Sequence, residues 1–255
     1  ADRQPEFTQI DIEASFIGQE DIIKLVQGLL GAMFNAGLGI DIPAEFPRMT
    51  YREAMDIYGS DKPDTRFDIK STDVADVFAT TEFKIFRGVR DGGGVVRAIN
   101  AKGFAGITTG QMNRLNEIAV QAGLPVKNLA FIKLEGGEYK SPLWKIFSDS
   151  EKEAVTAKMN LEEGDIVFFA AGSRESVSTI LGRVRSECAV MQDLNNDPAQ
   201  FNFLWVVDFP LLAQDEESGD WVAVHHPFTR PHPDDIGLLE KGDYANVRAV
   251  AYDVV

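Results

Sequence analysis

The first group of side chains that could do chemistry is an alternating run of polar residues near the beginning of the chain. Residues 7–16 alternate strictly between polar and apolar positions, which is typical of a half-buried β-strand. Because successive strand residues point to opposite faces, Gln9, Asp11 and Glu13 share one face. An amide and two carboxylates in a row suit the lining of a ligand site. The alternative is a solvated strand face on the protein surface.

The second group is a pair of adjacent histidines, His225 and His226, two of only three in the chain. They end a predicted β-hairpin over residues 203–229, whose arms are 203–209 and 221–226. The connection between the arms is polar and holds Gly219, as expected of an exposed loop. Neighbouring strand residues face opposite ways, so one histidine can face a site while the other faces away. A core histidine beside a surface histidine is an equally acceptable interpretation.

The elements that must position these groups include an amphipathic helix over residues 19–38, whose apolar residues recur at spacings of three and four. A capping box at Thr50 and Glu53 predicts a second helix, 51–58, which stops at Gly59. Residues 59–66 are rich in turn-forming and charged residues, and we place a domain boundary there.

Residues 67–200 have a different pattern, in which short strands and helices follow one another. Strands are predicted at 82–89, 95–100, 128–134 and 165–171, and helices at 109–122, 148–159 and 173–191. The glycines at 92–94 lack the Lys-Ser/Thr ending of a phosphate-binding loop, so a hairpin turn between the first two strands explains them better. This region is predicted to be an α+β domain with its own core.

After the hairpin, His232 lies between two prolines and is expected in an exposed loop before a short helix that ends near Lys241. Residues 246–255 are predicted to form a final strand. This strand carries Asp253, a further carboxylate on what we expect to be the same sheet as the hairpin.

The composition limits the classes of protein. The net charge of −15 disfavours a nucleic-acid grip by this chain alone, because phosphate contacts need concentrated Lys and Arg. The sequence has neither an apolar run long enough to span a membrane nor a basic and apolar leader, so we expect neither a span nor a signal peptide. The single cysteine, Cys188, cannot form an internal disulfide and is expected to serve packing, which suits a cytoplasmic location.

Four stretches of the chain closely resemble the bacterial-type aspartyl-tRNA synthetases, and they occur in that family's order: 3–13, 58–64, 204–210 and 225–229. The resemblance implies a class II synthetase fold, an antiparallel sheet with helices, carrying an inserted α+β domain. The implied division is 1–66 and 201–255 for the catalytic domain and 67–200 for the insertion. It also implies a chain that begins inside the family's second motif and ends before its third, so the isolated fragment is expected to be inactive.

The same resemblance implies roles for residues at both ends of the chain. Gln4 would lie beside ATP, and Arg3 would lie in the loop that meets the tRNA acceptor end. Gln9 and Asp11 match positions that line the aspartate pocket, with Asp11 suited to the substrate ammonium, and Glu13 would lie deeper in the same network.

Three further residues receive roles in this way. His225 matches a histidine that contacts the side-chain carboxylate of the substrate, His226 matches its neighbour in the same wall, and Asp253 would help to hold the Mg²⁺ that accompanies ATP.

The reaction that the resemblance implies needs no protein nucleophile or general acid or base. L-aspartate attacks the α-phosphate of ATP, and the resulting aspartyl group passes to tRNA for aspartate, or also to tRNA for asparagine. A homodimer of the full-length protein is expected. The competing hypothesis is a non-catalytic module for tRNA binding or assembly, in which the inserted domain, which resembles a domain of a tRNA-dependent amidotransferase subunit, is the functional part.

Overall fold

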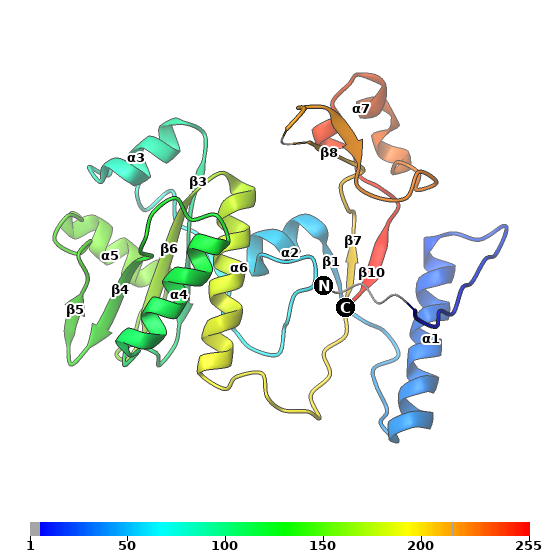
Figure 1. The fold of residues 1–255 in the computed structure, drawn as a ribbon, viewed down its shortest axis with the longest axis horizontal. Helices are drawn as coiled ribbons and strands as arrows, with labels where there is room; N and C mark the ends of the chain where they lie inside the picture. Colours follow the sequence, from blue (N-terminus) through cyan, green and yellow to red (C-terminus); the bar gives the residue numbers. More distant parts are fainter. Residues whose placement is uncertain (1–5, 216) are drawn as a thin grey trace. The chain divides into compact units, whose positions relative to one another are not determined.

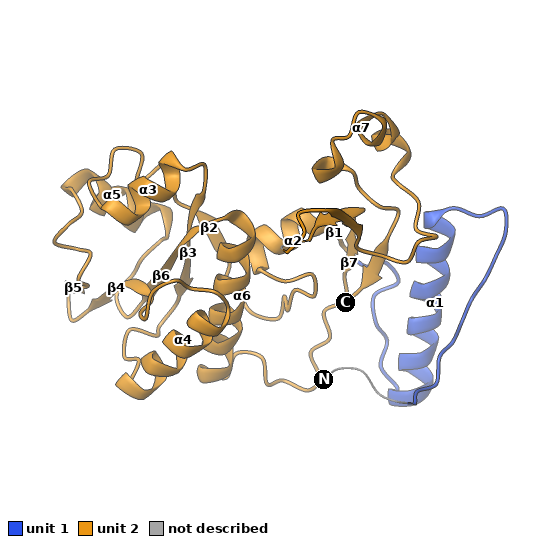
Figure 2. Ribbon diagram, turned by 45° about the horizontal axis from the view of Figure 1, so that its top comes forward, with its two compact units in different colours: residues 1–46 blue, residues 47–255 orange. Residues whose placement is uncertain are grey.

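The structure is a computed structural model that describes residues 6–215 and 217–255. It divides into two compact units, residues 1–46 and residues 47–255 (Figure 2).

The first unit contains one helix, α1 (Gln19–Leu38), with the bounds that the apolar spacing predicts. The helix begins after Gly18, whose N–H donates to the Asp21 carboxylate at 2.9 Å, and it ends at Gly39 in the left-handed conformation with φ of 67°. The strand predicted at 7–16 was wrong, because no part of this segment pairs with another strand among the described residues. Its apolar side chains are exposed, with Phe7 at 70% and Ile10 at 67%.

A five-stranded antiparallel sheet in the order β2-β3-β6-β4-β5 dominates the second unit (Figure 1). Its strands are β2 (Ser71–Asp73), β3 (Val95–Ala101), β4 (Ala130–Glu135), β5 (Glu138–Lys140) and β6 (Ile166–Gly172). Four helices accompany it: α3 (Lys84–Asp91), α4 (Thr109–Gln121), α5 (Asp149–Lys158) and α6 (Arg174–Met191).

The two faces of this sheet carry separate cores, because side chains alternate along each strand. On the face toward α4 and α6, Ile99 and Phe168 pack with helix residues such as Leu115. On the face toward α3 and α5, Val167 and Phe169 join a group of phenylalanines. The packed sheet with helices on both faces confirms the predicted α+β class.

Local signals predicted most of these elements well. The box formed by Ser148 and Glu151 opens α5, with the Glu151 N–H donating to Ser148 Oγ at 3.3 Å and the carboxylate accepting from the Ser148 N–H at 2.7 Å. The strand predicted at 82–89 was wrong, because α3 occupies most of it. Phe83, Phe86 and Val89 recur every three residues, and the helix buries Phe86 to 2% exposure.

A second, mixed sheet has the order β1-β7-β10 and consists of β1 (Arg48–Thr50), β7 (Trp205–Val207) and β10 (Tyr252–Val254). β1 is parallel to β7, and β10 is antiparallel to it. β1 leads directly into α2 (Tyr51–Tyr58), whose first turn is closed by the predicted capping box at Thr50 and Glu53.

The predicted hairpin had the wrong first arm. β9 (Trp221–Ala223) pairs with β8 (Leu212–Gln214), while β7 pairs with β1 and β10. The reason is a break after β7: Asp208 adopts a left-handed conformation with φ of 58°, and Pro210 follows it. The chain changes direction there and starts a new strand.

The C-terminal part contains η1 (Pro233–Asp235), α7 (Ile236–Glu240) and η2 (Tyr244–Asn246). The strand predicted at 246–255 is shorter than expected: only β10 is a regular strand, preceded by isolated bridges at Arg248 and Ala249. Asp253 nevertheless lies on the sheet of β7, opposite Val206, as predicted.

Helices α2 and α6 pack unusually closely where α2 ends. A Cβ built on Gly182 would lie 2.5 Å from the Gly59 carbonyl oxygen, and one built on Gly59 would lie 2.1 Å from the Ser178 carbonyl oxygen. Gly59 also needs its left-handed φ of 67° to end α2. Glycine at both positions allows the two backbones to touch.

Beside this contact, Arg185 of α6 is buried to 2% exposure and bonds to main-chain carbonyls. Its Nε donates to the Ile69 carbonyl at 2.5 Å, and its Nη2 donates to the Asp64 carbonyl at 2.5 Å. The guanidinium also lies over the rings of Phe67 and Tyr58, 4.0 and 4.9 Å from their centres. Burial lowers the pKa of Arg185 to about 10. One side chain thus holds the segment that leads from α2 into the five-stranded sheet.

The two ends of the predicted insertion lie close together. The Asn202 amide donates to Thr65 Oγ1 at 3.4 Å, which joins residues 137 positions apart in the chain. Neighbouring exit and entry points are what an inserted domain requires. We therefore propose the division 1–66, 67–200 and 201–255 as domains of the parent protein.

Candidate functional site

The two adjacent histidines follow β9 rather than forming part of it. His225 is partly buried, and its ring packs edge-on against Phe209 at a centroid distance of 5.5 Å. His226 is exposed, and its Nδ1 accepts from the Phe228 N–H at 3.2 Å, which closes a tight turn. The two rings therefore have different environments, as the sequence predicted. The cause is a turn after β9 rather than the alternation of side chains along a strand.

His225 has a feature that packing alone does not explain. Its Nε2 is buried and has no hydrogen-bond partner among the residues that the structure describes. A buried polar atom without a partner costs about 1–3 kcal/mol, so such atoms usually serve a ligand or a water molecule. His225 is therefore suited to contact a ligand through Nε2.

Asp253 lies on β10 with an exposed carboxylate. Mg²⁺ prefers oxygen ligands and is commonly held by one or two carboxylates together with substrate phosphates. Asp253 fits the part of a single such ligand. Among residues 6–215 and 217–255, no group of three or more His, Cys, Asp or Glu side chains could hold a metal ion by itself.

The predicted polar face lies in the first unit. Gln9, Asp11 and Glu13 are exposed in a segment without regular secondary structure. The prediction that they line one cavity with His225 stays a prediction. Arg3 and Gln4 lie outside the described residues.

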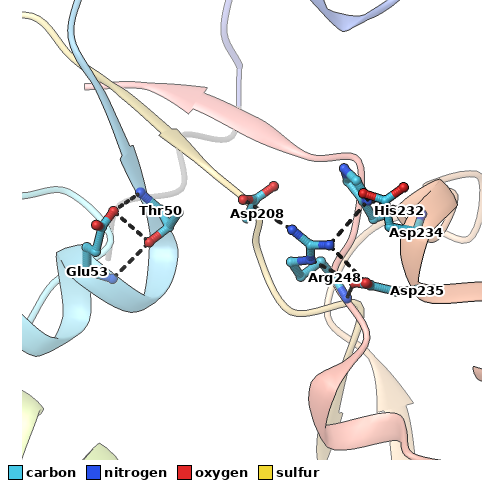
Figure 3. A network of polar contacts seen from close by, with 7 residues as sticks. All are labelled: Thr50, Glu53, Asp208, His232, Asp234, Asp235 and Arg248. Atoms are coloured by element: carbon cyan, nitrogen blue, oxygen red, sulfur yellow. Dashed lines mark hydrogen bonds and ion pairs between the residues drawn. The ribbon is translucent and has the colours of Figure 1, made fainter. Parts of the chain in front are cut away.

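Sequence reasoning missed a polar network centred on Arg248 (Figure 3). Its Nε donates to Asp235 Oδ2 at 2.7 Å, and its Nη2 donates to Asp235 Oδ1 at 2.9 Å. His232 Nδ1 lies 3.4 Å from Nη2, and the Asp208 carboxylate lies 3.7 Å from Nη1. His232, expected to be an exposed loop residue, is instead half-buried. No local signal joins Asp235 to Arg248, because they are 13 positions apart.

A hollow of about 620 Å³ lies between α2, the first turn of α6 and the Arg248 network. Asp56 and Arg174 line it and form an ion pair at 2.6 Å. Of the described candidates within residues 47–255, neither histidine of the 225–226 pair nor Asp253 lines this hollow.

Cys188 of α6 is fully buried in the core, and burial raises the pKa of its thiol to about 12. This confirms its packing role. No helix in the described part of the chain combines the length and apolar character that crossing a bilayer requires.

A sequence model of the family described as class II tRNA synthetases (D, K and N) matches residues 1–255. The chain belongs to this family of synthetases, which confirms the resemblance seen in the sequence.

Among individual relatives, the chain is 48% identical over 259 residues to the aspartate–tRNA(Asp/Asn) ligase of Opitutus terrae. This alignment covers 100% of this chain and 43% of that protein. It is 47% identical over 256 residues to the aspartate–tRNA ligase of Geobacillus kaustophilus, with coverage of 100% and 43%. It is 44% identical over 256 residues to the aspartate–tRNA(Asp/Asn) ligase of Bacillus subtilis, again with coverage of 100% and 43%. The chain thus spans less than half of the length of these relatives.

Proposed function

We propose that this chain is part of the catalytic region of an aspartate–tRNA ligase. The parent protein activates L-aspartate with ATP, releases pyrophosphate, and transfers the aspartyl group to tRNA. The observation that carries the proposal is the match of the family to residues 1–255 rather than to residues 67–200 alone. A match over both flanks favours the enzyme over a separate tRNA-binding or assembly module.

The candidate residues bind and orient the substrate rather than react with it. Asp11 places a carboxylate against the substrate ammonium, and Gln9 and Glu13 complete that wall of the pocket. His225 directs its unpartnered Nε2 to the side-chain carboxylate of aspartate, with His226 beside it. A site built around a carboxylate leaves polar groups mispaired when it is offered the amide, which discriminates aspartate from asparagine.

The remaining roles lie toward ATP and tRNA. Gln4 contacts the nucleotide and Arg3 the acceptor end of tRNA, and Asp253 would provide one oxygen ligand for the Mg²⁺ that accompanies ATP. The bound metal would neutralise charge on the phosphates. Catalysis then rests on positioning and charge stabilisation, to which fixed amides, carboxylates and imidazoles are suited. We also propose that the parent acts as a cytoplasmic homodimer.

The test replaces Asp11 by Asn in the full-length parent. Removing one charge from a desolvated ammonium–carboxylate pair costs about 2–5 kcal/mol, since the other charge is left unmatched. The kcat/KM for aspartate should therefore fall by about 30-fold to several thousand-fold, while the KM for ATP changes little. Pyrophosphate exchange, with aspartate and ATP varied separately at fixed pH, measures both.

Glu45→Gln is the matched control, because Glu45 is an exposed acid in the same unit and should leave both constants within about twofold. Wild-type aspartate kinetics in the Asp11→Asn enzyme would remove Asp11 from the site. A loss confined to ATP would move it to the nucleotide pocket.

A further inference from the structure

The segment at 247–250 is the middle member of three extended segments. On one side it bonds to the chain that leaves β7, and on the other side it bonds to the chain that follows the histidines. The four main-chain hydrogen bonds are Leu211 N–H to Val247 O at 2.9 Å, Ala249 N–H to Phe209 O at 2.7 Å, His232 N–H to Arg248 O at 2.7 Å and Val250 N–H to Arg230 O at 3.0 Å.

The side chain of Arg248 ties these three segments together. It forms a forked pair with Asp235, and the Arg248 main-chain N–H donates to the same carboxylate at 2.9 Å. On its other side it faces Asp208, at the point where the chain leaves β7. Figure 3 shows the guanidinium between the two carboxylates, with His232 above it. A planar fork can satisfy this geometry, whereas an ammonium cannot.

The Arg248–Asp235 pair is sheltered from solvent on the side of the carboxylate. The Asp235 side chain is 7% exposed, and Arg248 is 38% exposed. The Arg248 guanidinium lowers the pKa of Asp235 to about 2, and the carboxylate raises the pKa of Arg248 in return. The pair therefore stays charged and joined throughout the physiological range.

This pair lies at the base of the turn that carries the histidines. The turn is held at its start by the Val224 N–H, which donates to the Leu211 carbonyl at 3.2 Å. It is held at its end by Arg230, whose carbonyl accepts from Val250. The ring of His225 rests on Phe209, whose own carbonyl accepts from Ala249. These three supports of the turn therefore belong to the segments that Arg248 joins.

We propose that Arg248, through Asp235, is a positioning residue for the two histidines. It does not touch substrate; it holds the turn 225–230 so that His225 Nε2 points at one fixed place. The proposal rests on the proposed function for the role of His225 in aspartate binding. A misplacement of about 1 Å at a binding group far from the chemistry can cost up to about 100-fold in activity, so a clamp of this kind should be visible in kinetics.

The first test uses this chain itself and needs no substrate. With only three histidines, a ¹H–¹³C spectrum of the imidazoles reports the turn directly. In Arg248→Gln and Asp235→Asn the signals of His225 and His226 should shift or broaden along with that of His232. Arg248→Lys should behave like the Gln variant, because it keeps the charge and loses the fork. If Arg248→Gln does not fold, the spectrum of Arg248→Lys provides the test.

Arg230→Gln is the matched control, since it removes a cation from the same segment and leaves the clamp intact. Its His225 signal should match that of the wild type. The proposal is overturned if only the His232 signal moves in the Arg248 variants while His225 and His226 keep their wild-type signals.

The second test is kinetic and uses the full-length parent. Arg248→Gln and Arg248→Lys should each raise the KM for aspartate between about 10- and 100-fold, with the KM for ATP within about twofold. The double variant with Asp235→Asn should lose no more than the worse single variant, since the two side chains act as a unit. The proposal would be overturned if the KM for ATP rose as much as the KM for aspartate. It would also be overturned if Arg248→Lys kept the wild-type KM for aspartate. The two proposals can fail separately. If the histidine signals of this chain respond as expected but the full-length parent shows no aspartate-dependent pyrophosphate exchange, the proposed function is refuted and the positioning role of Arg248 stands.

Discussion

Replacing Gly182 by Ala tests how firmly the five-stranded domain is attached to α2. The added Cβ would lie 2.5 Å from the carbonyl oxygen, 2.8 Å from the carbonyl carbon and 2.9 Å from the Cα of Gly59. All three are backbone atoms of a helix end, which cannot rotate away as a side chain would. The two helices must therefore separate by several tenths of an ångström or more.

The magnitude follows from two opposing effects. Overpacking of a close-packed contact costs about 1–3 kcal/mol, and contact with backbone places this site near the upper end. Alanine gains about 1 kcal/mol over glycine in a helix interior. We expect Gly182→Ala to lower the free energy of unfolding by about 2 kcal/mol, measured by urea denaturation followed by far-UV circular dichroism.

Gly88→Ala is the matched control, because Gly88 lies inside α3 and a Cβ there would meet nothing within 4 Å. It should raise the free energy of unfolding by about 0.5–1 kcal/mol. If Gly182→Ala were stabilised to the same extent as Gly88→Ala, the close approach of α2 and α6 described above would be incorrect.

Two further predictions concern buried ionic groups. Arg185→Lys should lower the free energy of unfolding by about 2–3 kcal/mol in the same urea assay, because lysine cannot satisfy the carbonyls of Asp64 and Ile69 together; an unchanged value would contradict the contacts. Asp235 has a folded-state pKa lowered from 3.8 to about 2, so its contribution of about 2 kcal/mol is complete above about pH 5 and is lost as pH falls toward about 2. The difference in unfolding free energy between wild type and Asp235→Asn should shrink over that window, and a constant difference would refute the pairing.

Elements with local signals were predictable from the sequence. The helix at 19–38 and the boxes at Thr50 and Ser148 were found at the right places, because a cap and the residue that completes it lie within one turn. The change of pattern over residues 67–200 also predicted a domain there, and that division stays a prediction. The failure at 82–89 was a failure of period: apolar residues three apart fit a helix, and Ile85, directly before Phe86, hid that spacing.

Strand partners were not predictable in the same way, because pairing joins residues far apart in the chain. The two apolar runs of the supposed hairpin are both strands, yet a left-handed Asp208 separates them and a third strand, β8, takes the place beside β9. Nothing in residues 203–229 alone reveals that β7 prefers β1 and β10. Arg248 and Asp235 escaped notice for the same reason, since their spacing carries no local meaning.

The polar run at residues 7–16 shows what this implies for the candidate site. A strand needs a neighbour to satisfy its N–H and C=O groups, and a period of two states only which side chains would share a face once that neighbour is present. In the described part of this chain no strand pairs with this segment, and both Ile10 and Asp11 are exposed. The polar face is therefore seen in the sequence but is not formed as one side of a sheet. The elements that surround His225, namely β8, β9 and the Arg248–Asp235 pair, all lie within residues 47–255. Its buried Nε2 is without a hydrogen-bond partner among the described residues. The histidine wall of the proposed pocket can therefore be tested in this chain, whereas the Asp11 wall requires the full-length parent.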